Sequence, residues 1–144
     1  MAPGYCTKTP LLVLLGLALT TTVCSKCDLS GKWKNGLGST MSIGSVDSKG
    51  GFEGSYLSAL SSTDNTIKES PLAGAQQLDD EPTVGFTVKW NFSYSVTSFV
   101  GQCFVDDNGN EVLETIWLLR SHVGERTDNW KATSVGTNSF TRQL

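Results

Sequence analysis

Two short stretches of the chain combine flat aromatic or branched apolar side chains with small hydroxyls. The first holds Trp90, Phe92, Ser93 and Ser95, and the second holds Trp117, Leu119 and Ser121. Each aromatic ring supplies about 150 to 250 Å² of apolar area, whereas a few hydrogen-bonding groups fix the orientation of a bound molecule. The two stretches therefore predict a pocket for a small ligand with a polar head.

Enzymatic chemistry is not indicated by the remaining polar residues. The sequence has one histidine, His122, and offers no nucleophile, base and orienting group in a recognisable set. Adjacent strand residues point to opposite faces, so His122 is interpreted as a surface residue beside Ser121. One histidine, with Cys27 and Cys103 expected to pair with each other, does not make a usual zinc site, and Asp106 and Asp107 fit a turn. We expect no catalytic residues, no metal and no cofactor.

Residues 1–25 have the pattern of a secretory signal peptide. Lys8 precedes an apolar run over 11–19, and Val23-Cys24-Ser25 offers small residues for cleavage. A membrane-spanning helix needs about 20 apolar residues, so this run is too short to be one. The sequence predicts a secreted, extracellular protein with no membrane anchor, whose single mature domain comprises residues 26–144.

The predicted mature domain is mildly acidic, with a net charge of about −4. It has no stripe of Lys and Arg, which argues against nucleic acid as the main partner. Removal of the signal also removes Cys6 and Cys24, so Cys27 and Cys103 remain and should pair in an oxidising compartment. Two buried free thiols are the alternative.

Short segments rich in Val, Thr, Phe, Tyr and Trp alternate with turn residues along the mature domain, without convincing helical periodicity. The expected strands cover 29–36, 40–46, 52–60, 72–77, 84–92, 98–105, 111–121 and 129–140. Asp47 to Gly51 predicts a hairpin, and Asn108-Gly109 predicts a second, tight one with positive φ values. Eight such strands predict an all-β fold, an eight-stranded antiparallel up-and-down β-barrel with room for one small ligand.

Strand alternation assigns side chains to the two faces of this barrel. In the range 111–121, Trp117 and Leu119 share the inner face, whereas Ile116 and Leu118 point outwards. An apolar outer face indicates that another subunit covers it.

The same alternation creates a conflict in the range 84–92 and just after it. Trp90 and Phe92 share one face, but Ser93 and Ser95 have the opposite parity. The strand must end or bulge near Phe92 if all four side chains serve one pocket.

Asn91-Phe92-Ser93 is the only glycosylation sequon in the sequence. Asn91 points outwards if Trp90 and Phe92 point inwards, which permits attachment of a glycan. A closely packed subunit interface would block it, so both outcomes stay open.

Seven motifs follow one another along the chain: CDLSGKWKNGLGSTMSIG, GGFEGSYLSAL, IKESPLAG, GFTVKWNFSYS, FVGQCF, ETIWLLRS and NWKATSVGTNSF. On these motifs, nearly the whole of the mature domain, from Cys27 to Arg142, resembles the avidin and streptavidin family of biotin-binding proteins. The resemblance implies a barrel that binds biotin at one end and assembles as a homotetramer. Gly31-Lys32-Trp33 alone would be weak, because lipocalins begin similarly, and Trp33 is interpreted as a plug of the closed barrel end.

The resemblance also implies roles for individual residues toward biotin. The ureido oxygen would be met by Asn35, Ser39 and Tyr56, the two ureido nitrogens by Asn138 and Ser58, and the ring sulfur by Ser95. The bicyclic ring would be enclosed by Trp90, Phe92, Phe99 and Trp117, and the carboxylate would be held by Ser61, Ser62, Thr63 and Ser93. Trp130 would cross a subunit interface and cap the site of a neighbouring barrel.

Two other functions remain open at this point. A lipocalin-like carrier of a hydrophobic molecule would share the signal peptide, the barrel and Gly31-Lys32-Trp33. Such a carrier has little use for the polar residues Asn35, Tyr56 and Asn138 converging at one end. A relative that has lost biotin binding and acts as an interaction protein is the second alternative.

Overall fold

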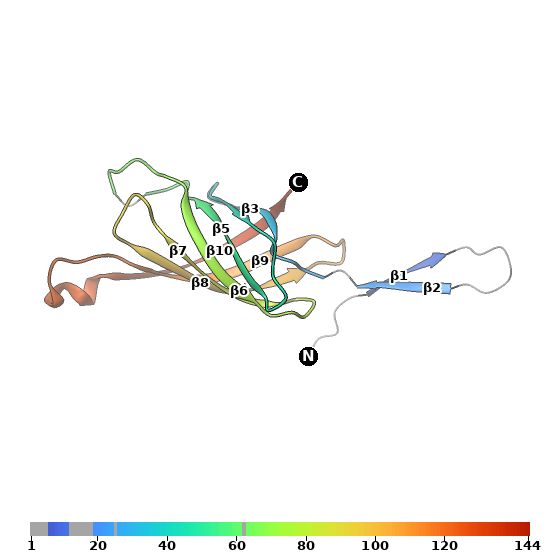
Figure 1. Cartoon of the computed structure of the whole chain (residues 1–144). Helices are drawn as coiled ribbons and strands as arrows, with labels where there is room; N and C mark the ends of the chain where they lie inside the picture. Colours follow the sequence, from blue (N-terminus) through green and yellow to red (C-terminus); the bar gives the residue numbers. More distant parts are fainter. Residues whose placement is uncertain (1–5, 12–18, 25, 62) are drawn as a thin grey trace.

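A computed structural model describes residues 6–11, 19–24, 26–61 and 63–144. Eight strands form a closed antiparallel barrel in which each strand pairs with its sequence neighbour and the last pairs with the first (Figure 1). They are β3 (Gly31–Asn35), β4 (Thr40–Ile43), β5 (Gly51–Leu57), β6 (Ser70–Gln76), β7 (Thr83–Lys89), β8 (Val96–Val105), β9 (Glu111–Arg120) and β10 (Thr133–Gln143). Closure removes every sheet edge, and the predicted fold class is confirmed.

Several of the predicted strands are too long at an end that faces a loop; the range 40–46, for example, ends at Ile43 as β4. β5 ends at Leu57, so residues 58–60 belong to the following loop. Residues 129–131 lie in a 3₁₀ helix, η1 (Arg126–Lys131), and not in the last strand. Backbone bonds from Asp128 N to Glu125 O (3.1 Å) and from Ala132 N to Asn129 O (3.2 Å) close this turn. Pairing with β9 begins only at Thr133.

The two predicted hairpins both exist, but one has a different turn. Gly50 has the positive φ of 88° that the β4–β5 connection needs. Between β8 and β9, Gly109 has φ of 80°, whereas no described non-glycine residue has a positive φ. The hairpin is present, and only the positive φ expected at Asn108 is wrong. The Asp106 carboxylate closes the loop 106–110 by accepting the backbone N–H groups of Asn108 (2.9 Å) and Asn110 (2.8 Å).

Alternation along the strands places side chains as predicted. On β9, Leu113 and Thr115 are buried, whereas Ile116 and Leu118 are 57% and 54% exposed. The inward side chains form one core that contains Trp33, Met41, Phe86, Val88 and Phe140. The outward apolar residues of β9 have no cover within the described chain.

The strand connections divide between two ends of the barrel. The described connections that follow β3, β5, β7 and β9 lie at one end, and they comprise residues 36–39, 58–61 with 63–69, 90–95 and 121–132. The segment 26–30 and the connections 44–50, 77–82 and 106–110 lie at the other. We call these the open end and the closed end.

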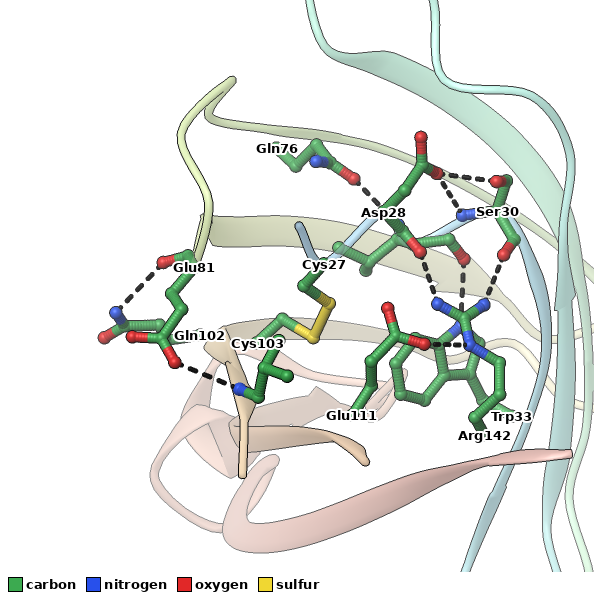
Figure 2. The surroundings of a disulfide bond; sticks show 12 residues. Cys27, Asp28, Ser30, Trp33, Gln76, Glu81, Gln102, Cys103, Glu111 and Arg142 are labelled. Carbon is green, nitrogen blue, oxygen red and sulfur yellow. Dashed lines mark hydrogen bonds and ion pairs between the residues drawn. A yellow bond between two sulfur atoms is a disulfide. The ribbon is translucent and has the colours of Figure 1, made fainter. Parts of the chain in front are cut away.

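Trp33 fills the closed end, as interpreted from the sequence. Its side chain is fully buried, and its indole nitrogen donates to the Leu29 carbonyl oxygen at 2.9 Å. The Arg142 guanidinium carbon lies 4.2 Å from the centroid of the indole ring, and Arg142 Nε is 2.6 Å from Glu111 Oε2. Arg142 also donates to the carbonyl oxygens of Asp28 and Ser30 (Figure 2). This network ties the last strand to the segment before β3.

A disulfide joins Cys27 to Cys103 beside this network (Figure 2). Both residues are fully buried. Backbone bonds reinforce the join, from Cys27 N to Asp80 O at 2.9 Å and from Cys103 N to Pro82 O at 3.0 Å. The predicted pairing is confirmed, and it links the start of the barrel to β8 at the closed end.

The N-terminal residues form a separate element. β1 (Cys6–Leu11) and β2 (Leu19–Cys24) pair with each other in a two-stranded antiparallel sheet, drawn on the opposite side of the barrel from η1 in Figure 1. The rest of 1–25 lies outside the described residues, so the signal peptide stays a prediction. Within the described ranges, no helix has the length and apolar character to cross a membrane.

Candidate ligand-binding site

A cavity of about 360 Å³ lies in the open end of the barrel. Its walls come from β3, β5, β8, β9 and β10 and from the loops that follow β3, β5 and β7. The lining residues are Asn35, Leu37, Ser39, Tyr56, Ser58, Leu60, Ser61, Thr63, Trp90, Phe92, Ser93, Ser95, Thr97, Phe99, Trp117, Leu119 and Asn138. The cavity therefore gathers residues from across the whole sequence at one place.

Three of the residues predicted to bind ligand are not part of this lining. Ser62 lies outside the described residues. Ser121 is half-buried just past β9, where its backbone N–H donates to the Ala132 carbonyl oxygen at 2.8 Å. Trp130 sits on η1 and is 83% exposed. Every other predicted ligand residue lines the cavity.

Leu37, Leu60 and Thr97 line the cavity but were not among the predicted residues. Thr97 shares the inward parity of Phe99, which the sequence could have revealed. Leu37 and Leu60 lie in loops, where alternation gives no direction. Both leucines add apolar surface near the mouth.

The break needed near Phe92 is present. β7 ends at Lys89, and residues 90–95 form an irregular turn closed by a bond from Trp90 N to Ser95 O at 3.3 Å. This turn lets all four side chains of the first stretch line the cavity. The Ser93 and Ser95 hydroxyls are hydrogen-bonded to each other, which holds both at the cavity wall.

Aromatic rings pack against one another around the cavity. Tyr56 meets Trp90 edge-on at a centroid distance of 5.4 Å and stacks on Phe99 at 5.7 Å. Trp90 also lies 5.6 Å from Phe92, and its indole nitrogen donates to Thr97 Oγ1 at 2.8 Å. These contacts fix the aromatic walls relative to one another.

The position of Trp117 depends on its strand neighbour Gly136. These two residues pair across β9 and β10. A Cβ atom built at Gly136 would lie 2.2 Å from the Trp117 ring, far closer than any van der Waals contact. Only glycine at this position allows the indole to lie flat on the strand beside it.

Asn35 provides an unused donor at the polar end of the cavity. Its side-chain oxygen accepts the backbone N–H groups of Leu37 (3.1 Å) and Ser39 (2.9 Å) and so fixes the β3–β4 turn. Its amide nitrogen Nδ2 is the one buried side-chain nitrogen or oxygen in the described residues without a hydrogen-bond partner. Leaving such a group unsatisfied costs about 1 to 3 kcal/mol. A ligand acceptor at this position would remove that cost.

Tyr56 and Ser39 supply two further polar groups near Asn35. Burial raises the pKa of Tyr56 from 10.0 to about 12, and contact with the Ser39 hydroxyl opposes this only in part. The phenol is therefore a neutral hydrogen-bond donor at physiological pH. Ser39 Oγ accepts the Ala59 N–H at 3.0 Å, which leaves the hydroxyl proton available to another acceptor.

The raised pKa of Tyr56 predicts a loss of stability in alkali. The folded state holds the phenolic proton more tightly than the unfolded state, so the contribution of Tyr56 is complete below pH 10 and is lost as pH rises toward about 12. The difference in unfolding free energy between wild type and Tyr56→Phe should fall over this window by about 1 to 3 kcal/mol. Denaturant titrations at several pH values measure it. A difference in unfolding free energy that stays constant from pH 10 to about 12 would contradict the raised pKa of Tyr56.

The described cavity lining contains no Asp, Glu, Lys, Arg or His. Its polar groups are amides, hydroxyls and one phenol. Neutral donors and acceptors among aromatic walls suit an uncharged polar head on an apolar body. The arrangement fits a binding site for such a molecule.

Comparison with known proteins agrees with this architecture. The family model described as the avidin family matches residues 23–143. The chain belongs to the avidin family. Avidin of Gallus gallus is 57% identical over 137 residues, which cover 92% of this chain and 90% of that protein. The family resemblance read from the motifs is confirmed.

Solved avidin-family structures share the fold. The crystal structure of xenavidin superposes with a TM-score of 0.81 at 51% identity, and the match covers 82% of this chain and 99% of that one. An X-ray structure described as a biotin-binding protein from chicken gives a TM-score of 0.80 at 55% identity, with 82% and 99% covered. The avidin-family barrel therefore accounts for the chain outside its N-terminal segment.

Proposed function

We propose that this protein is a secreted, non-enzymatic biotin-binding protein that holds the vitamin in the cavity at the open end. The observation that carries the proposal is the buried, unpartnered Nδ2 of Asn35 in a neutral, aromatic-walled cavity. A urea carbonyl oxygen is a neutral acceptor that matches this donor. Relatives named avidin and biotin-binding protein support the same ligand.

The polar residues suit the ureido group of biotin. Asn35, Ser39 and Tyr56 can each donate to the ureido oxygen, because Asn35 Nδ2 has no partner among the described residues and Ser39 and Tyr56 each carry a hydroxyl proton. The ureido nitrogens need acceptors, and the side-chain oxygens of Asn138 and Ser58 lie in the same lining. A buried urea with partners on all its polar atoms avoids the cost of desolvation.

The aromatic residues suit the rest of the ligand. We assign the bicyclic ring to the space between Trp90, Phe92, Phe99 and Trp117, with Ser95 near the sulfur. If each ring buries half of its area, the gross apolar contribution is about 10 kcal/mol, an upper value that ordering reduces. The carboxylate then points to the mouth, toward Ser61, Thr63 and Ser93. Ser62, which the resemblance adds to this group, lies outside the described residues.

Assembly as a homotetramer is part of the proposal. The outward residues Val100, Ile116, Leu118 and Val135 are between 54% and 68% exposed and lie on the adjoining strands β8, β9 and β10. A contiguous apolar patch of this kind marks an association surface. Trp130, 83% exposed on η1, would then cap the cavity of a neighbouring subunit.

Thermal unfolding with and without biotin tests the proposed function. A ligand specific to the native state raises the apparent stability by about 4 kcal/mol at a thousandfold excess over the dissociation constant. We expect the melting temperature of the secreted protein to rise in excess biotin. An unchanged melt would show that this relative no longer binds biotin.

Substitution of Trp130 tests separately whether a neighbouring subunit caps the cavity. In Trp130→Ala, the loss of half an indole surface predicts roughly 10- to 100-fold faster release of biotin. Trp130→Phe keeps an aromatic ring and should lose much less. Competition-chase measurements give both rates. Equal release from wild type and Trp130→Ala would remove the cross-subunit role.

The biological role proposed is sequestration of biotin outside the cell, which would deprive microbes of the vitamin. It follows from tight binding together with secretion. Growth of a biotin-requiring bacterium in medium that contains the protein measures it, with biotin-saturated protein as the control.

A further inference from the structure

The turn between β7 and β8 carries a feature that biotin binding does not use. Asn91, Phe92 and Ser93 form the sequon, and Phe92 and Ser93 line the cavity. Asn91 is exposed and lies on the outer side of the turn, beside the start of β6. An exposed turn is where an N-linked glycan can be accommodated.

Two hydrogen bonds hold Asn91 in this position. Its backbone N–H donates to Ser70 Oγ at 3.0 Å, and its side-chain Nδ2 donates to the Glu69 carbonyl oxygen at 2.9 Å. An amide nitrogen carries two hydrogens, and Glu69 takes one of them. The second is free for replacement, so a glycan can be attached while the bond to Glu69 remains.

A surface depression of about 410 Å³ lies beside Asn91. It is lined by Asn65, Thr66, Lys68, Asn91, Phe92, Ser93 and Tyr94. Tyr94 is 92% exposed and offers an amphipathic ring face, while the amides and hydroxyls offer donors and acceptors. A neutral, hydroxyl-rich saccharide has the chemistry that this lining can contact.

We propose that Asn91 carries an N-linked glycan whose first sugars lie in this depression. The proposal rests on passage through the secretory pathway, which is part of the proposed function. A lipid-linked oligosaccharide diphosphate is the donor. A bond forms between Nδ2 and the anomeric carbon, the bond from that carbon to the diphosphate oxygen breaks, and one proton leaves Nδ2. The lipid diphosphate departs with the bonding electron pair.

The glycan has a defined relation to the biotin cavity. Phe92 and Ser93 line both the depression and the cavity, and Asn65 Nδ2 donates to the Phe92 carbonyl oxygen at 2.8 Å. The turn 90–95 and the described residues of the loop after β5 thus form a wall between the two spaces. A glycan on Asn91 covers the outer side of this wall and leaves the cavity open to free biotin.

Mass spectrometry of the full chain secreted by eukaryotic cells tests the attachment. Treatment with a peptide N-glycosidase should lower the mass by one oligosaccharide and leave a carboxylate at position 91. Asn91→Gln, which keeps an amide but destroys the sequon, should show no shift. A wild-type mass that treatment leaves unchanged would overturn the proposal.

Lysine acylation tests where the sugars lie. Lys68 lines the depression, whereas Lys49 is exposed in the β4–β5 hairpin at the closed end. We expect Lys68 to be acylated several-fold more slowly in the glycosylated protein than after removal of the glycan, with Lys49 unchanged. Equal rates at Lys68 in the two forms would show that the sugars do not occupy the depression.

Biotin binding by the same samples separates this proposal from the proposed function. A protein that gains stability from biotin but has no glycan contradicts only the glycan. A glycosylated protein that gains no stability from biotin contradicts only the biotin site.

Discussion

Asn35→Asp should weaken biotin binding by at least about 100-fold at neutral pH, which corresponds to about 2.7 kcal/mol. The substitution keeps the side-chain shape and the oxygen that accepts from Leu37 and Ser39. It replaces the unpartnered Nδ2 with an acceptor that faces the ureido oxygen. The loss combines a missing hydrogen bond with repulsion between two oxygens. Competition binding against biotin measures the change.

Acidic pH provides an internal control for Asn35→Asp. Protonation of the new carboxyl group restores a donor in the same place, so affinity should recover as pH falls, whereas wild type should not gain affinity. The melting temperature without biotin, measured across the same pH range, shows whether the variant remains folded. A folded variant that binds biotin as tightly as wild type would remove Asn35 from the ureido site.

Replacement of both Cys27 and Cys103 with alanine should lower the unfolding free energy by about 4 kcal/mol in the chain-entropy model. The bridge spans a sequence separation of 76 residues, and loss of so long a cross-link frees the unfolded chain. Denaturant titration measures the difference. The bridge lies at the closed end, so the folded variant should bind biotin with unchanged affinity.

Reduction of the wild-type protein is the matched control for the double variant. Reduction under denaturing conditions, followed by refolding with the thiols blocked, should give the same loss of stability. A double variant as stable as wild type would show that the network of Trp33, Arg142 and Glu111 holds the closed end without the bridge. A large loss of biotin affinity in the folded variant would contradict the separation of the two ends.

The strand interiors could be predicted because alternation follows directly from strand geometry. Trp117 and Leu119 reach the cavity, and Ile116 and Leu118 face outwards, as their parity requires. Parity also showed that Ser93 and Ser95 would face away from Trp90 on a regular strand. The strand ends at Lys89, and the turn that follows brings these side chains to the same cavity. A conflict within the pattern thus indicated an irregular backbone at the site.

The loops were less predictable because local hydrogen bonds, and not side-chain pattern, determine them. The loop 106–110 has the expected position, but Asp106 accepts from the N–H groups of Asn108 and Asn110, and Asn108 does not take the positive φ expected of it. Those bonds, with the Asn110 side chain first, also lower the pKa of the Asp106 carboxyl group. Residues 126–131 form a short 3₁₀ helix, which the pattern of apolar residues did not predict. Leu37 and Leu60 line the cavity from loops, where strand alternation does not predict the direction of a side chain.

The polar residues of the cavity could not be predicted from the strand pattern alone. Nothing in the sequence alone distinguishes Asn35 from other asparagines near turns. The two polar atoms of its side chain differ in the structure, since Oδ1 accepts N–H groups of the β3–β4 turn and Nδ2 has no partner among the described residues. The motif resemblance pointed to this residue, and the unpartnered Nδ2 is the observation on which its proposed contact with biotin rests.

Gly136 makes the width of the pocket depend on a residue that has no side chain with which to touch biotin. Because a methyl group there would overlap the Trp117 ring, any larger residue must push the indole toward the centre of the barrel. Protein engineers who wish to admit smaller or flatter biotin analogues could therefore narrow the pocket from behind its wall. Natural drift at this position would alter ligand selectivity while every ligand-contacting residue kept its identity.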